Sequence, residues 1–319
     1  MWTAISAGNS AGGPDRGAVR REAPEGRRFG AAPWLLGMAG LVGGAALLAG
    51  CGGARAVSRP VPLEREIELN RRATVAFERG SYAAALDGYR EALRIAQAIE
   101  HVDGIAANLL DLAAVSRALG SGEQAARAVD EILADGNKLP FSPAQRSAAA
   151  YLRALLFADA NALADASRLA AQALALCGEA ACGNEGRIVN LQARIAFLGG
   201  DRPAALAAAL AALALNRAAK ADEETANSLR IAADVRSALG ELAKAAEGYA
   251  AALALDKRLG LPAKISLDLL RLGDVAAGQA RTADARSFYR RAQDVSRGAG
   301  DGQGTIEAAN RIRALEQPR

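Results

Sequence analysis

The sequence is poor in the side chains that most enzymes use for catalysis. Its 319 residues include one histidine, His101, and three cysteines, and no Walker A loop, HExxH motif or CxxC pair occurs. A catalytic triad would have to use His101, and the residues around it do not resemble a nucleophile elbow. We therefore expect no enzymatic activity, no metal and no cofactor. For His101 we expect a solvated or capping position beside a turn between helices.

Aromatic residues and charge of one sign are also scarce. Phe, Trp and Tyr make up 4% of the chain, which argues against a β-sandwich or barrel, because strands favour aromatic and β-branched side chains. The formal net charge is only +4, so the sequence gives no support to a nucleic-acid partner. Alanine, in contrast, fills about a quarter of the positions and is the best helix former. This composition predicts closely packed helices.

The first 50 residues contain a hydrophobic run that predicts export. Residues 34–50 carry no charge, Arg27 and Arg28 come shortly before them, and Cys51 follows directly. A basic start, an apolar stretch of about 15 residues and a small-residue cleavage site are typical of a secretory signal peptide. A membrane-spanning helix usually needs about 20 apolar residues, so an uncleaved anchor is the less favoured alternative.

The four residues from Leu48 to Cys51 resemble the lipobox of bacterial lipoproteins. This resemblance implies that residues 1–50 are a lipoprotein signal peptide and that Cys51 is lipidated, which anchors the chain to a membrane. Many inner-membrane lipoproteins of enteric bacteria have aspartate after the cysteine, whereas this chain has Gly52. The resemblance therefore favours the outer membrane of the bacterial cell envelope, facing the periplasm. Residues 51–65 would be the lipidated cysteine with a flexible tether, and residues 66–319 a helical repeat domain.

Self-comparison shows six repeats of about 40 residues. Alanine recurs in one frame at Ala85, Ala125, Ala166, Ala205, Ala245 and Ala285. Twelve residues before each of these lies another small residue: Ala73, Ala113, Ala154, Ala193, Ala233 or Gly273. Seven residues after each lies Ala92, Ile132, Ala173, Ala212, Ala252 or Ala292. Small residues at such crossing points let two antiparallel helices approach closely. The turns between the paired helices are expected at Gly80, Gly120, Asn161, Gly200, Gly240 and Ala280.

The segment from Gly80 to Leu93 resembles the second half of a tetratricopeptide repeat (TPR). Tyr89, Tyr249 and Tyr289 share one position at which this family also places an aromatic residue, so we expect these side chains to pack in the core. The resemblance implies an all-α fold, a right-handed superhelical array of about six long TPR-like helix pairs. A C-terminal capping helix near residues 305–315 would cover the exposed end, as repeat arrays require.

The two remaining cysteines, Cys177 and Cys182, lie five residues apart in the clearest interruption of the repeats. Disulfides persist in the compartment to which an exported protein is sent, so a bridge is favoured over free thiols. A metal site is the least favoured reading, because the chain has only one histidine and no second cysteine pair. A bridge needs the two Cα atoms within about 7 Å, which a turn between the cysteines would allow.

The resemblance also predicts a binding groove. In such arrays the concave face is formed by the first helix of each pair. The repeat register predicts that this face carries Asn190, Arg194, Asn227, Arg230 and Asp234. Asparagine can bond a peptide backbone and arginine can bind a carboxylate with two parallel bonds. An ordinary solvated helix face is the alternative interpretation of these residues.

Together these observations predict a membrane-tethered periplasmic scaffold that binds protein or peptide partners, for example in cell-envelope assembly. The alternative is a fixed structural subunit of an envelope complex such as secretion, pilus or cell-wall machinery. Its sign would be a wide apolar patch on the convex face. A ligand-binding receptor is a third and less favoured possibility, because the sequence shows no convergent cluster of His, Glu, Asp and Cys.

Overall fold

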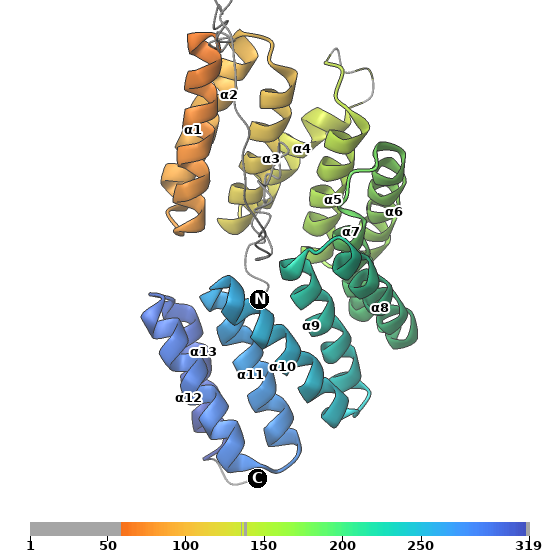
Figure 1. Cartoon of the computed structure of the whole chain (residues 1–319), viewed down its shortest axis with the longest axis vertical. Helices are drawn as coiled ribbons and strands as arrows, with labels where there is room; N and C mark the ends of the chain where they lie inside the picture. Colours follow the sequence, from red (N-terminus) through yellow and green to blue (C-terminus); the bar gives the residue numbers. More distant parts are fainter. Residues whose placement is uncertain (1–58, 135, 137–138, 317–319) are drawn as a thin grey trace, which may run out of the picture. The chain divides into compact units, whose positions relative to one another are not determined.

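A computed structural model describes residues 59–134, 136 and 139–316 (Figure 1). These residues form thirteen helices and no strand: α1 (Val61–Glu78), α2 (Tyr82–Ala98), α3 (Val102–Ala118), α4 (Gly122–Leu133), α5 (Pro143–Asp159), α6 (Leu163–Ala180), α7 (Glu185–Leu198), α8 (Arg202–Ala218), α9 (Asp222–Ala238), α10 (Leu242–Leu259), α11 (Pro262–Gly278), α12 (Thr282–Gly298) and α13 (Gly302–Ala314). The predicted all-α repeat array is therefore confirmed. The predicted signal peptide and Cys51 lie outside the described residues.

The helices pack in chain order as a repeat solenoid. Each helix contacts the next, and short turns reverse the chain between them. Odd-numbered helices also contact one another at α1–α3, α3–α5, α5–α7, α7–α9 and α11–α13. The odd-numbered helices therefore form one layer and the even-numbered helices the other. We call the outward surfaces of these layers the odd-helix face and the even-helix face. No helix in the described part has both the length and the hydropathy of a membrane span.

Small residues occupy the helix crossings as the repeat register predicts. All six alanines of the frame that starts at Ala85 are 0% exposed. Tyr89, Tyr249 and Tyr289 are also buried, which confirms that they belong to the core. Gly273 shows why the crossing positions must be small, because a Cβ there would lie 2.3 Å from Cε1 of Tyr289. Close packing of this kind tolerates no added methyl group without a shift of its neighbours.

The turns inside the helix pairs also fall where expected. The six predicted turn residues, from Gly80 to Ala280, all have positive φ, and the value at Ala280 is +59°. A left-handed conformation costs a residue with a Cβ about 1–2 kcal/mol. Five of the six positions hold glycine or asparagine, the residues that adopt this conformation most readily. Ala280 is the exception and bears that cost.

Helix α1 begins earlier than the predicted domain boundary at residue 66. It starts at Val61, so residues 61–65 are helical rather than part of a flexible tether. Pro62 is compatible with this start, because a residue in the first turn needs no backbone N–H for the helix. The third repeat departs most from the others, and its α5 begins with a capping box between Ser142 and Gln145.

Candidate functional site

The odd-helix face carries charged side chains that bond from one helix to the next. On α5, Asp159 accepts hydrogen bonds from Nε of Arg117 on α3 at 2.6 Å and from Nη2 of Arg194 on α7 at 2.9 Å. Burial favours the neutral acid, but the two arginines outweigh it and lower the pKa of Asp159. Both arginine side chains are only 14% exposed. Arg194 thus lies on the face that the sequence predicts, but it is already bonded to a carboxylate.

A second group of cross-helix ion pairs lies on α9, α11 and α13. Arg271 Nε lies 3.4 Å from Asp234 Oδ1, and Arg311 donates to Asp274. Tyr249 donates to Asp234 at 2.7 Å, so a core tyrosine supports this surface from beneath. Asp234 is only 11% exposed, whereas the side chains of Arg271, Asp274 and Arg311 are 30–35% exposed. These three are the accessible members of the group.

Arg230 does not line this face, and the prediction that it does is wrong. It is 1% exposed and lies between Asp256 of α10 and Asp268 of α11. Its Nε donates to Asp268 at 2.6 Å and its Nη2 donates to Asp256. Burial raises the pKa of Asp268 to about 7 despite the opposing effect of Arg230, and it also raises the pKa of Asp256. The side chain is enclosed because its side of α9 packs against the next helix pair.

Asn190 and Asn227 are also buried rather than exposed, at 5% and 4%. Each donates its amide to Glu224 Oε2, at 3.0 and 3.1 Å. Asn190 in addition accepts a hydrogen bond from Ser228 at 2.7 Å. Because these bonds join α7 to α9, the two amides are not free to bond a peptide backbone. The structure therefore brings two of the predicted residues together, but as internal links between helices.

Two polar contacts, one at the start of α3 and one within it, were not predicted from the sequence. Nδ1 of His101 lies 3.1 Å from Glu66, a residue that is 3% exposed, and makes no capping bond. His101 occupies the N-cap position of α3 with its side chain 32% exposed, as expected beside a turn, but its side chain bonds to Glu66 and not to the helix backbone. Asp111 accepts a hydrogen bond from Asn70 at 2.9 Å and has no cationic partner among the described residues. Burial raises the pKa of Asp111 to about 6. In both contacts the two bonded residues lie about one repeat apart in the sequence, and this spacing is the signal that could have identified them.

The structure places a disulfide between Cys177 and Cys182, whose Cα atoms are 5.0 Å apart. Helix α6 ends at Ala180 and Ala181 adopts a left-handed conformation, so a turn separates the two cysteines. Within the described residues these cysteines and Glu185 form the one group of three potential metal ligands. Sulfurs that are bonded to each other are not thiolate ligands, so this group does not offer a metal site in its bridged form.

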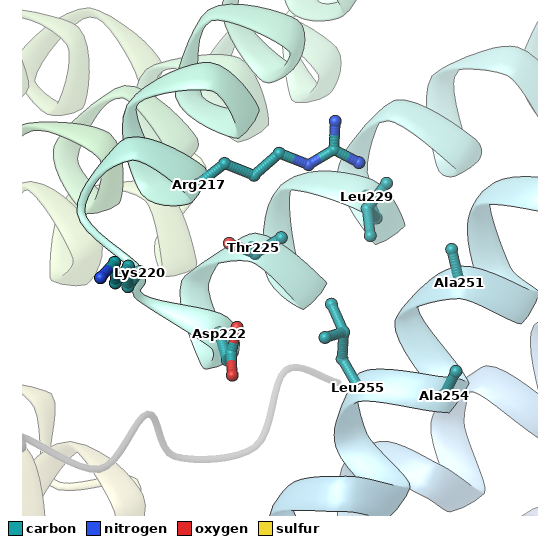
Figure 2. A pocket seen from close by; sticks show the side chains of 8 residues that line it. All are labelled: Arg217, Lys220, Asp222, Thr225, Leu229, Ala251, Ala254 and Leu255. Atoms are coloured by element: carbon teal, nitrogen blue, oxygen red, sulfur yellow. The ribbon is translucent and has the colours of Figure 1, made fainter. Parts of the chain in front are cut away.

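The even-helix face is polar on most repeats but apolar on α8. The other even-numbered helices carry exposed ion pairs within the helix or at its start: Glu91–Arg94, Glu123–Arg127, Asp165–Arg168, Glu241–Lys244 and Asp294–Arg297. Helix α8 has no charged residue between Arg202 and Arg217, and Leu210 and Leu215 are 42% and 43% exposed. A pocket of about 470 Å³ lies beside the end of α8 (Figure 2).

Comparison with known proteins supports the fold. No protein-family model and no curated protein matches the chain. Among solved structures, it is similar to a signal-transduction ATPase with a tetratricopeptide repeat sensor from Pyrococcus horikoshii, with a TM-score of 0.61 and 14% identity over 79% of this chain. The chain spans only 37% of that protein.

Two Rap proteins are similar over most of their own length. The apo form of RapI gives a TM-score of 0.58 and 12% identity, covering 81% of this chain and 87% of RapI. A Rap protein complexed with Competence and Sporulation Factor gives a TM-score of 0.52 and 13% identity, covering 81% of this chain and 76% of that protein. Identities this low establish a TPR-like fold and nothing further about activity.

Proposed function

We propose that this chain is a membrane-tethered periplasmic scaffold that binds protein or peptide partners through its odd-helix face. The observation that carries the proposal is the accessible charge of Arg271, Asp274 and Arg311, which lies across two neighbouring helices. A Rap protein of similar fold is complexed with Competence and Sporulation Factor, so an array of this kind can hold a partner. The tether in this proposal is a lipid on Cys51, and the location is the outer membrane.

The degree of burial distinguishes residues that can bind a partner from those that hold the fold. A surface ion pair contributes about 0–1 kcal/mol, so a partner can replace the pairs of Arg271 and Arg311 at little cost. Removing Arg230 from its two buried carboxylates would instead cost several kcal/mol. We therefore place the binding surface on α11 and α13 and exclude Arg230, Asn190 and Asn227 from it.

The test is co-purification from cross-linked membranes. It compares the wild-type chain with a double variant, Arg271→Gln together with Arg311→Gln, in which both cations are replaced by neutral side chains. We expect the wild-type chain to recover a set of partners that this double variant recovers much less well. Arg290→Gln is the matched control, because Arg290 is exposed on α12 and lies on the other face. Helicity measured by circular dichroism should be equal in all three proteins. Equal recovery of the same partners by the double variant would rule out the odd-helix face as the binding surface.

The second candidate function is a fixed structural subunit of an envelope complex. The observation that favours it is the apolar outward surface of α8, which differs from the charged surfaces of the other even-numbered helices. Exposed apolar patches on soluble domains mark interaction sites. A fixed subunit should co-purify with its complex in constant ratio and resist high salt, whereas binding through surface charges weakens as salt rises.

A further inference from the structure

We propose that the even-helix face holds a second binding site, which takes a helix of a partner protein with an apolar side and carboxylates at one end. The site consists of the exposed residues of α8 and the adjoining pocket, and we call it the α8 patch. It lies on the other layer from the surface of the proposed scaffold function and does not depend on it. The exposed residues of α8 in this patch are Ala204, Ala207, Leu210, Ala211, Ala214 and Leu215.

The first argument is the shape and polarity of α8. A solvated helix normally carries charged side chains on its outward side, as the other even-numbered helices do. The outward side of α8 is alanine with two exposed leucines over the whole stretch between Arg202 and Arg217. Helix axes pack 8–10 Å apart depending on the side chains at the contact, and alanine permits the closer approach. This surface therefore fits another helix better than it fits water.

The second argument is the pocket at the end of α8. Its volume is about 470 Å³, and its apolar wall consists of Leu229 on α9 with Ala251, Ala254 and Leu255 on α10. Figure 2 shows Leu229 and Leu255 bordering the same open space, with Arg217 extending above them. An aliphatic side chain of a bound helix would enter this space, occupy part of it and cover both leucines. Burying such a side chain is the usual anchor of a protein interface.

The third argument is uncompensated positive charge at the rim of the pocket. Arg217 and Lys220 line it, and neither has an ion-pair partner among the described residues. The acid beside them, Asp222, already accepts a hydrogen bond from Arg258 at 2.7 Å. Charge complementarity across an interface selects the partner and its orientation. The bound helix should therefore carry its carboxylates at the end that meets Arg217 and Lys220.

The composition of α8 also distinguishes a helix from a lipid surface. Helices that lie on membranes insert large side chains such as Trp, Phe and Leu, with Lys and Arg along the polar side. The exposed side of α8 is mostly alanine, and its cations gather at the two ends of the helix. Alanine adds little to burial in lipid but lets a second helix come close. The partner that this surface fits is a protein helix.

The test uses fluorescein-labelled synthetic helices of 18 residues with leucine and alanine on one side and three glutamates at one end. A second probe carries glutamine in place of glutamate, and a third carries lysine. We expect the full chain to bind the glutamate probe at least about tenfold more tightly than the glutamine probe, as measured by fluorescence anisotropy. The variant Arg217→Glu with Lys220→Glu should lose that preference and bind the lysine probe. Leu210→Gln should weaken the glutamate and glutamine probes equally.

The matched control is Arg79→Glu with Arg290→Glu, which reverses two exposed charges away from the patch. It should bind all probes as the wild type does. Absence of probe binding, equal affinity for the glutamate and glutamine probes, or unchanged binding by the Arg217 and Lys220 variant would overturn the proposal. Two other results would also overturn it: vesicles of phosphatidylglycerol and phosphatidylethanolamine that displace the glutamate probe, or a dimer of the chain that Leu210→Gln dissociates and the probe does not.

Discussion

Replacing Arg230 with alanine should be among the most damaging single changes in the array. It removes the cation that bonds both Asp256 and Asp268, two carboxylates that are 0% exposed. Breaking a buried ion pair by removing one partner costs about 3–5 kcal/mol, because the remaining charge stays in the interior. Natural domains are stable by only about 5–15 kcal/mol, so this loss takes a large share of the total.

The pH dependence of the variant identifies the cause of the loss. Burial already raises the pKa of Asp268 to about 7 in the presence of Arg230, and without the arginine this pKa rises further. The folded state then binds the proton more tightly than the unfolded chain, so stability increases as the pH falls. Part of the unfolding free energy that the variant loses at pH 8 should therefore be regained at pH 5. A loss caused by a cavity alone would be the same at both values.

Urea denaturation at pH 8 and pH 5, followed by circular dichroism, measures the effect. Hydrogen exchange then locates it, because repeat arrays lose structure locally and α9, α10 and α11 should be affected first. Arg236→Ala is the control, since Arg236 lies on the same helix and has no ion-pair partner among the described residues. We expect it to cost less than about 1 kcal/mol. If Arg230→Ala were no more destabilising than this control, the assignment of a buried ion triad would be wrong.

Three further substitutions and one measurement on the unchanged protein test other parts of the molecule. Asp111→Asn should stabilise the chain by up to about 3 kcal/mol at pH 8, because it removes a partly buried carboxylate whose pKa is raised to about 6. Since the wild-type acid is protonated at low pH, this gain should shrink below pH 6 and vanish near pH 4, as urea denaturation would show. Ala280→Gly should raise stability by about 1 kcal/mol in a thermal melt, because φ is +59° there. Cys51→Ser should prevent lipidation, so that mass spectrometry finds no lipid on the variant and the variant leaves the membrane fraction. Thiol counting on denatured, unreduced mature protein should find no free thiol, because Cys177 and Cys182 are bridged and Cys51 carries the lipid.

The helix crossings could be read from the sequence because their physical requirement is simple. Small residues are favoured where two helix axes come close, with Ile132 the one exception, and at Gly273 even one added carbon would meet Tyr289. The turn residues inside the helix pairs followed from the need for positive φ, and of these six only Ala280 is neither glycine nor asparagine. These features depend on residue size and backbone conformation, so a repeat in one frame identifies them.

The burial of Arg230 was not predicted in the same way, although other repeats carry large apolar or aromatic residues at its register position. Arg230 lies three residues before its small anchor, and the same register position holds Leu110, Tyr151 and Leu270 in other repeats. Tyr151 and Leu270 are 6% and 3% exposed, so this position faces the next helix pair rather than solvent. A polar residue in such a position indicates a buried bond. Its partners, Asp256 and Asp268, lie on two other helices, and no local pattern identifies them.

The buried polar bonds specify which helices pair and in which register, which the alanine contacts alone do not. Interfaces built from alanine and leucine are similar from repeat to repeat, so helix shape alone distinguishes poorly between correct and shifted pairing. Arg230 between two carboxylates, and Ser228 bonded to Asn190, each require one particular neighbour, because a shift would leave a buried polar group without its partner. The same bonds withdraw these side chains from any ligand. The residues that specify how α7, α9 and α11 pack are thus distinct from those to which we assign partner binding, at the more exposed ion pairs of α11 and α13 and at the α8 patch.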